Sequence, residues 1–336
     1  MKHTRIEGLP FTASRIALGT WAIGGWKWGG TNESDAIATI HHALDAGINI
    51  IDTAPAYGFG HSEEIVGKAL AERRDQVLIA TKAGMVWAGG KLGRDSSPAS
   101  LRQQLEGSLR RLRRDVIDLY QIHWPDESVE FEISAATLES FRREGKIRAI
   151  GLSNCTVPQI ERFAKGATLA ALQPPYNLFE RGAETEILPY AKARHLVTLC
   201  YGSLCRGLLT GKITTSTTFK GDDLRKDDPK FQPDRRGQYL AAAAKLEALA
   251  REKFGKSLLA FAVRWVLDRG NTIALWGARH PNQLKPIDDI MGWHIDDLTM
   301  GEVDGILQED DHGPGGAGVH GAATDHAGVR LKHPSL

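Results

Sequence analysis

Short apolar runs alternate with longer amphipathic stretches along most of the chain. Between the runs, apolar residues recur at helical spacing, as in the stretch from Leu101 to Leu112. Apolar strands separated by amphipathic helices are typical of a parallel sheet covered by helices. Eight such units favour a single-domain α/β fold, a (β/α)8 TIM barrel, over an open doubly wound sheet. The runs are "RIALG", "INIID", "VLIAT", "VIDLYQI", "IRAIGL", "LAALQ", "LVTLCY" and "TIALWG".

Capping residues mark where the helices should begin. Asn32 is expected to cap the first barrel helix, which should end before Gly47. Ser97, followed by Pro98, is expected to cap the third barrel helix in the same way.

Three stretches fall outside the repeat. Residues before about 15 are expected to form a hairpin that caps the bottom of the barrel. Residues 202–237 form a long polar loop after the seventh strand, followed by an Ala-rich helix near 239–254, and loops this long are usually functional or disordered. Residues 312–336 are Gly-rich with little periodicity. We therefore expect a barrel domain over 1–311 and a tail over 312–336.

Charge and cysteine content narrow the partners and the compartment. The chain has 42 Lys and Arg against 41 Asp and Glu, so no basic field favours nucleic acid or an anionic membrane. Cys155, Cys200 and Cys205 form no CxxC pair, which indicates a reducing compartment. The N-terminal stretch lacks the apolar core of a signal peptide, and no run of 18 apolar residues occurs. We expect a cytoplasmic protein with a small-molecule substrate; monomer and homo-oligomer both stay open.

No metal site is expected from the histidines. His41 and His42 are adjacent on a helix, so their side chains point in different directions. The other histidines considered lie in the tail and are too widely spaced for a structural zinc motif. These are His312, His320, His326 and His333.

Polar residues follow three neighbouring strands. Asp52 and Tyr57 follow the second strand, Lys82 follows the third and His123 the fourth. The carboxyl ends of barrel strands meet at one face, so these side chains should converge. The Lys82 ammonium is expected to lower the pKa of the Tyr57 phenol, while Asp52 keeps Lys82 charged and His123 orients a substrate oxygen. Such a group suits protonation of a developing alkoxide, as in carbonyl reduction by hydride. No GxGxxG follows the first strand, so the usual dinucleotide fingerprint is absent.

The sequence resembles the aldo-keto reductases, and within them the bacterial branch with the "GTWAIGGW" opening, the general-stress-protein-like NADPH-dependent reductases. The matching stretches run from about residue 15 to residue 285. They are "ALGTWAIGGWKWGG", "IDTAPAYGFGHSEEIVGKAL", "ATK", "DLYQIHWPD", "GKIRAIGLSN", "QPPYNLFER", "YGSLCRGLLTGK", "GDDLRKDDPKFQ" and "ALWGARHPNQL".

The resemblance implies a nicotinamide cofactor extended across the barrel mouth and a catalytic tetrad with Tyr57 as the acid. It implies that Tyr201 stacks on the nicotinamide, and that the loop over 202–237 can fold over the cofactor. The implied tetrad is Asp52, Tyr57, Lys82 and His123. The cofactor-binding residues expected are Gly19, Thr20, Trp21, Ser153, Asn154, Gln173, Tyr201, Gly202, Ser203, Leu204, Arg206, Gly207, Leu208, Lys212, Arg225, Gly277, Ala278, Arg279 and Gln283. Of these, Ser153, Asn154 and Gln173 match the residues that hold the carboxamide.

NADPH is the cofactor expected, with NADH use also possible. Arg279 follows the eighth strand, where its guanidinium could pair with a ribose phosphate, and no acidic residue follows that strand to bind a bare hydroxyl. Lys285 and Pro286 stand where many relatives have Glu and Asn. The expected substrate pocket is a fairly apolar cleft with polar groups at its base. It comprises Trp21, Tyr57, Trp87, His123 and Trp124.

The expected function is NAD(P)H-dependent reduction of aldehydes or ketones to alcohols, with reversal on alcohols, sugars or polyols left open. One alternative is a regulatory protein that senses the nicotinamide cofactor and turns over slowly. A second alternative is a metal-dependent barrel hydrolase, which the missing histidine pair at the strand ends disfavours.

Overall fold

The computed structural model describes residues 1–71, 73 and 76–308. The predicted tail, residues 312–336, and the predicted end of the barrel domain at 311 lie outside the described residues.

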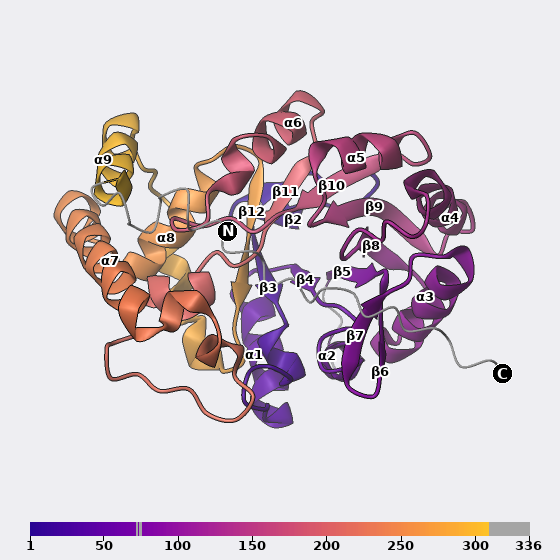
Figure 1. Cartoon of the computed structure of the whole chain (residues 1–336), viewed down its shortest axis with the longest axis horizontal. Coiled ribbons are helices and arrows are strands. Elements are labelled where there is room, and N and C mark those ends of the chain that lie inside the picture. Colours follow the sequence, from indigo (N-terminus) through magenta and orange to yellow (C-terminus); the bar gives the residue numbers. More distant parts are fainter. Residues whose placement is uncertain (72, 74–75, 309–336) are drawn as a thin grey trace.

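Eight parallel strands close into the barrel in the described part of the chain (Figure 1). The last strand of the barrel pairs with the first, with Ala274 opposite Ile16, and this pairing closes the sheet. Each strand overlaps one of the apolar runs of the sequence, with β5 and β9 extending one or two residues beyond theirs, so the prediction of a (β/α)8 barrel is confirmed. The strands are β3 (Ile16–Gly19), β4 (Ile50–Asp52), β5 (Leu78–Ala83), β8 (Ile117–Ile122), β9 (Ile147–Ser153), β10 (Leu169–Gln173), β11 (Val197–Cys200) and β12 (Thr272–Gly277).

Helices surround the barrel and are capped largely as the sequence indicates (Figure 1). The Asn32 side chain accepts a hydrogen bond from the Asp35 amide, and the Ser97 hydroxyl accepts one from the Ser100 amide. Both predicted N-caps are therefore confirmed. The helices are α1 (Glu33–Asp45), α2 (His61–Ala71), α3 (Pro98–Leu112), α4 (Phe131–Arg143), α5 (Val157–Ala164), α6 (Ile187–Ala193), α7 (Pro233–Phe254), α8 (Leu258–Leu267) and α9 (Asp297–Gln308). Shorter 3₁₀ turns are η1 (Ala22–Gly24), η2 (Gly182–Glu184), η6 (Pro281–Gln283) and η7 (Lys285–Ile290).

The barrel strands are buried on both faces, and alternate residues serve two cores. In β3, Ile16 and Leu18 pack against the helices, whereas Ala17 points into the barrel. This division follows from the period-two alternation of side chains along a strand. It explains why the strands read as continuous apolar runs.

The N-terminal hairpin consists of β1 (His3–Thr4) and β2 (Ala13–Ser14), paired antiparallel. Its loop carries Ile6 and Leu9, which are buried against the inward-facing side chains of the barrel strands. Nδ2 of the Asn49 side chain, just before β4, donates to the Thr12 carbonyl. The hairpin therefore closes the amino-terminal end of the barrel, as expected, and leaves the opposite end for the polar residues.

Two segments differ from the expectation. A second hairpin, β6 (Met85–Ala88) with β7 (Lys91–Arg94), follows the third barrel strand, and Gly89 and Gly90 turn it with φ of 56° and 74°. The long loop after β11 contains the turns η3 (Cys205–Thr210), η4 (Leu224–Lys226) and η5 (Pro229–Phe231). The helix predicted near 239–254 begins earlier, at Pro233, because proline suits the first turn of a helix.

Candidate active site

Asp52, Lys82 and Tyr57 meet at the carboxyl ends of β4 and β5. The Lys82 ammonium donates to Asp52 Oδ1 at 2.6 Å, to the Thr53 carbonyl at 3.0 Å and to the Tyr57 hydroxyl at 3.2 Å. Lys82 is fully buried beneath the phenol. His123 follows β8, and its ring stands edge-on to the Tyr57 ring at 5.6 Å between centroids. The structure thus brings together the four residues that the strand ends indicated.

The loop that carries Tyr57 is held by close backbone contact. A Cβ on Gly58, whose φ is +67°, would lie 2.2 Å from the Gly24 carbonyl oxygen, so only glycine fits there. A Cβ on Gly24 would lie 2.7 Å from the Tyr57 carbonyl oxygen. Turn η1 and the Tyr57 loop are therefore in close backbone contact, which restricts the orientation of the Tyr57 side chain.

A buried hydroxyl cluster links the first strand to the same loop. The Thr20 hydroxyl donates to the Asp52 carbonyl at 3.0 Å and accepts from Ser62 at 2.7 Å, and Ser62 also contacts the Thr53 hydroxyl. Thr20 was expected to contact the cofactor, but its hydroxyl is occupied within this cluster. The sequence gives no signal for this role of Ser62, because a serine at a helix start usually serves only as a cap.

The electrostatics of Tyr57 differ from the expectation. Burial raises the pKa of the phenol above its ordinary value, and the nearby Lys82 ammonium opposes this rise without cancelling it. The lowering of the Tyr57 pKa by Lys82 that the sequence predicts is therefore present, but burial outweighs it and the net shift is upward. Burial also acts against the charge of Lys82, but Asp52 and Tyr57 together raise the pKa of the ammonium. Lys82 stays charged and Tyr57 stays protonated at neutral pH.

His123 is neutral at neutral pH. Burial lowers the pKa of its imidazole well below the ordinary value, and the Lys82 ammonium lowers it further. A neutral imidazole can both donate and accept a hydrogen bond.

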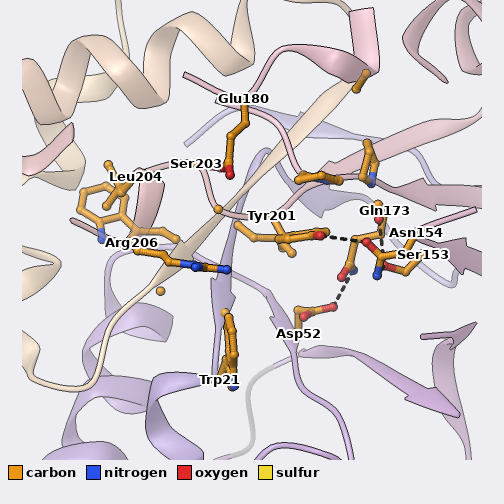
Figure 2. Close-up of a pocket in the computed structure, with 18 of the residues that line it drawn as sticks. Trp21, Asp52, Ser153, Asn154, Gln173, Glu180, Tyr201, Ser203, Leu204 and Arg206 are labelled. Carbon is orange, nitrogen blue, oxygen red and sulfur yellow. Dashed lines mark hydrogen bonds between the residues drawn. The ribbon is translucent and has the colours of Figure 1, made fainter. Parts of the chain in front are cut away.

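Beside the tetrad, Ser153, Asn154, Gln173 and Tyr201 form a continuous hydrogen-bonded group (Figure 2). Gln173 Nε2 donates to Asp52 Oδ2 at 2.8 Å, and the Ser153 hydroxyl donates to the Gln173 carbonyl at 2.8 Å. Asn154 Nδ2 donates to the Ser153 hydroxyl, while Asn154 Oδ1 accepts from the Tyr201 hydroxyl at 2.8 Å. This group places amide and hydroxyl functions next to the flat ring of Tyr201.

The loop after β11 lies along one side of the cavity. Gly202, Ser203, Leu204, Arg206, Gly207, Lys212 and Arg225 line it, whereas Leu208 is buried in the core between barrel and helices. The Leu208 side chain lies outside the cavity lining, and the cofactor contact expected of this residue stays a prediction. In Figure 2 the Arg206 side chain extends between Tyr201 and Trp21. Its guanidinium is paired with Asp228.

At the end of β12, Gly277, Ala278, Arg279 and Gln283 line the cavity. The Arg279 amide donates to Gln283 Oε1 at 2.8 Å. The Arg279 guanidinium donates to the Trp28 carbonyl at 2.6 Å and to the Gly30 carbonyl at 3.2 Å. No acidic residue follows β12 in sequence, but the fold brings Asp223 close. Burial acts to raise the pKa of the Asp223 carboxyl, and Arg225, with a smaller contribution from Arg279, lowers it overall.

Hydrogen bonds join loop residues from two distant parts of the chain on this side of the cavity. Asp222 Oδ2 accepts from the Lys27 amide at 2.7 Å, and Oδ1 accepts from the Gly29 amide at 2.9 Å. The Arg225 guanidinium lies over the Trp28 ring, 5.2 Å from its centroid. We call residues 221–225 and 26–30 together the latch.

The cavity has a volume of about 990 Å³, and several aromatic side chains contribute to its wall. Trp21 and Trp124 line it, as expected, together with Tyr57, His123, Gly19 and Thr20. Trp87 is not among the lining residues; its ring packs near Phe59, at 5.9 Å between centroids. The structure adds lining residues that the sequence analysis missed, although "GGWKWGG" was a signal for two of them. They are Trp26, Trp28, Met85 and Leu92.

Within the described ranges, no three His, Cys, Asp or Glu side chains gather into a group that could hold a metal ion. None of the described helices combines the length and the apolar character needed to cross a membrane.

Fold and site together place the chain among the (β/α)8 barrel oxidoreductases. Residues 15–308 match the model of the aldo/keto reductase family. The chain therefore belongs to the aldo-keto reductase family, whose members reduce carbonyl groups with nicotinamide cofactors.

Individual relatives agree with this membership. The chain is 52% identical over 311 residues to aldo-keto reductase YhdN of Bacillus subtilis, covering 92% of this chain and 94% of that protein. It is 35% identical over 302 residues to the NADH-specific methylglyoxal reductase of Escherichia coli, covering 85% and 92%. The solved structure of the glycerol dehydrogenase from Gluconobacter oxydans is 50% identical, with a TM-score of 0.86 over 99% of this chain and 98% of that one.

Proposed function

We propose that the protein reduces aldehydes or ketones to alcohols and that Tyr57 is the general acid. The observation that carries the proposal is the position of the Lys82 ammonium, 2.6 Å from Asp52 Oδ1 and 3.2 Å from the Tyr57 hydroxyl. A buried ammonium stabilises the negative charge that a phenol acquires when it gives up its proton. When bound, the nicotinamide cofactor supplies the hydride. Tyr57 then donates its proton to the developing alkoxide and recovers it in the reverse reaction.

His123 and Tyr57 are proposed to hold the substrate oxygen between them. Both side chains line the cavity, and the imidazole edge faces the phenol ring. Since burial keeps His123 neutral, the imidazole can donate one hydrogen bond to the oxygen without adding a second positive charge beside Lys82.

The lining of the cavity fits a nicotinamide dinucleotide. Gln173 Nε2 is held by Asp52, so the carbonyl oxygen of that side chain remains to accept a hydrogen bond from a carboxamide. Tyr201 offers a flat ring beside it. Farther along the cavity stand four basic side chains, which suit phosphate groups. They are Arg206, Lys212, Arg225 and Arg279.

We propose that NADPH is preferred and that NADH is also used. Arg279 lines the cavity, and its guanidinium donates hydrogen bonds to the neutral Trp28 and Gly30 carbonyl groups. A ribose phosphate would provide it with a charged partner. The NADH-specific Escherichia coli relative shows that a similar chain can favour the other cofactor.

Small oxygenated molecules are the substrates we propose. The relatives include a methylglyoxal reductase and a glycerol dehydrogenase, both named for such compounds. The wall formed by Trp21, Trp28 and Trp124 would also accept planar apolar aldehydes.

We further propose that the barrel domain extends to residue 311 and that the protein works in the cytoplasm. Cys155, Cys200 and Cys205 are free thiols, as suits a reducing compartment.

The first experiment is a titration of the purified protein with NADPH and NADH, followed by quenching of tryptophan fluorescence. Addition of 4-nitrobenzaldehyde then reports cofactor oxidation. Tight binding with prompt oxidation supports the reductase. Tight binding with negligible turnover of the aldehyde would instead favour the cofactor sensor, and absence of binding would refute both.

Tyr57→Phe is the decisive variant. Removing the hydroxyl should lower kcat for carbonyl reduction by about 10²-fold or more, because the developing alkoxide loses its proton donor. The dissociation constant of NADPH should stay close to that of the wild type. Tyr190→Phe, on α6 and outside the cavity lining, is the control and should keep full activity. Wild-type turnover in Tyr57→Phe would remove Tyr57 from the mechanism.

A further inference from the structure

Gln121 is a fully buried amide inside the barrel that the site described above does not use. It lies in β8, opposite Lys82 of β5 and Gly151 of β9. The residue two positions before it, Leu119, belongs to the apolar core inside the barrel. Strand alternation therefore directs Gln121 into the barrel, just below the polar group at the mouth.

The Gln121 side chain reaches across the barrel to Gln173. Gln121 Oε1 accepts a hydrogen bond from Gln173 Nε2 at 3.3 Å, and the same Nε2 donates to Asp52 Oδ2 at 2.8 Å. Gly151 makes room for this path, because a Cβ there would lie 2.9 Å from Gln121 Cγ and 3.3 Å from Oε1. The contact thus depends on a glycine in the next strand.

Lys82 determines the direction of these linked hydrogen bonds, that is, which group donates and which accepts. An ammonium can only donate, and the Asp52 oxygens accept from the groups that face them. Gln173 must therefore turn its Nε2 group toward Asp52, and the second hydrogen of that group meets Gln121 Oε1. With both amide hydrogens engaged inside the barrel, Gln173 has only its carbonyl oxygen left for the cavity that it lines.

We propose that Gln121 is a positioning residue: it fixes the Gln173 amide so that an acceptor oxygen, and not an NH₂ group, faces the carboxamide of the cofactor. The inference rests on the proposed function, because it takes a nicotinamide carboxamide as the group beside Gln173. A carboxamide has an NH₂ group to donate, so the orientation decides whether this contact attracts or repels. Without Gln121, the second hydrogen of Gln173 Nε2 is buried without a partner, and the amide loses one of the two bonds that hold it.

The test compares Gln121→Met with the wild type for two cofactors. Methionine keeps the length of the side chain and removes the acceptor. The probes are NADP⁺ and its 3-acetylpyridine analogue, in which a methyl group replaces the carboxamide NH₂. Dissociation constants are measured by tryptophan fluorescence quenching. Gln121→Met should weaken NADP⁺ by roughly tenfold, the effect of one buried hydrogen bond. The analogue should bind to both proteins within about twofold, because it cannot donate to Gln173.

Two further variants separate orientation from packing. Tyr120→Phe is the matched control: Tyr120 precedes Gln121 in β8, is buried in the core outside the barrel, and its hydroxyl has no partner among the described residues. It should leave both dissociation constants unchanged. Gln121→Glu keeps an acceptor oxygen at the same reach and removes the Nε2 group, which also has no partner among the described residues. It should retain the wild-type preference for NADP⁺ over the analogue.

Equal weakening of NADP⁺ and the analogue in Gln121→Met would overturn the proposal, since it would show a structural effect alone. Unchanged NADP⁺ affinity would also overturn it, as would a Gln121→Glu variant that loses the preference. If the wild-type protein binds NADP⁺ and reduces the aldehyde but the variants do not behave as expected, the proposed function stands and only the role of Gln121 is rejected. If the wild-type protein binds neither cofactor, both the proposed function and the role of Gln121 are rejected.

Discussion

At the scale of single residues, burial of Tyr57 determines the expected pH dependence. Burial raises the pKa of the phenol despite the nearby Lys82 ammonium, so the acid form persists throughout the neutral range. His123, whose pKa is lowered, stays neutral there as well. We expect kcat for carbonyl reduction to be flat between about pH 7 and 9 and to fall only above about pH 10, as Tyr57 loses its proton.

The reverse reaction should show the opposite slope, because alcohol oxidation needs the ionised phenol as a base. Its rate should rise with pH until the pKa of Tyr57 is passed. Lys82→Met removes the cation that opposes burial, so the rise should move to higher pH. Rate profiles of both directions, measured across the same buffers, check this. A reduction rate that falls already near neutral pH would contradict the raised pKa.

Arg279 provides a further prediction at the scale of single residues. Arg279→Ser should raise the dissociation constant of NADPH by about tenfold or more, since a charge-assisted contact to the ribose phosphate is lost. The dissociation constant of NADH should change by less than about threefold, because that cofactor has no phosphate there. The guanidinium also bonds the Trp28 and Gly30 carbonyls, so damage to that loop would weaken both cofactors alike. Equal losses would therefore reject the phosphate contact.

At the scale of structural elements, the latch joins the loop after β11 to the loop after β3. Asp222 accepts hydrogen bonds from the Lys27 and Gly29 amides, so one carboxylate holds two segments far apart in sequence. Asp222→Ala should increase the rate of NADPH release by about tenfold, because an order of magnitude corresponds to about 1.4 kcal/mol of lost contact. Stopped-flow fluorescence measures the release rate.

The control for the latch is Asp227→Ala, an exposed aspartate of the same loop. It should leave the release rate unchanged, because the hydrogen bonds to the Lys27 and Gly29 amides come from Asp222 and not from Asp227. Equal acceleration in both variants would mean that loop charge, and not the two amide contacts, slows release.

At the scale of the whole molecule, the N-terminal hairpin closes the end of the barrel away from the site. Ile6 is fully buried against the inward-facing apolar residues. Ile6→Ala should lower the free energy of unfolding by about 2 to 5 kcal/mol, because it removes buried methyl groups and leaves a cavity. Urea denaturation measures this loss. NADPH affinity should be preserved, since the site lies at the opposite end.

A surface substitution provides the comparison. Leu298 is 73% exposed on α9, so Leu298→Ala should change the free energy of unfolding by less than about 0.5 kcal/mol. Similar losses for the two variants would show that the hairpin does not contribute to the barrel core.

The sequence by itself determined the architecture and the approximate place of the chemistry. Each barrel strand overlaps a predicted apolar run, because a strand buried on both faces is largely apolar. The carboxyl ends of such strands meet at one face, so Asp52, Tyr57, Lys82 and His123 could be expected to converge before any distance was known. The motifs of the aldo-keto reductases pointed to the same residues.

Only the tertiary structure decided where the individual side chains point and how they are charged. Leu208 stands in a matching stretch and Trp87 in the predicted substrate pocket, yet the Leu208 side chain packs in the core and Trp87 lies outside the cavity lining. The raised pKa of Tyr57 depends on burial by surrounding segments, and Gln121 reaches Gln173 because Gly151 leaves space between strands. Arg279 contacts Trp28 across 251 positions of sequence. Local patterns report periodicity and order along the chain, whereas direction, burial and electrostatic environment depend on contacts between segments that are distant in sequence.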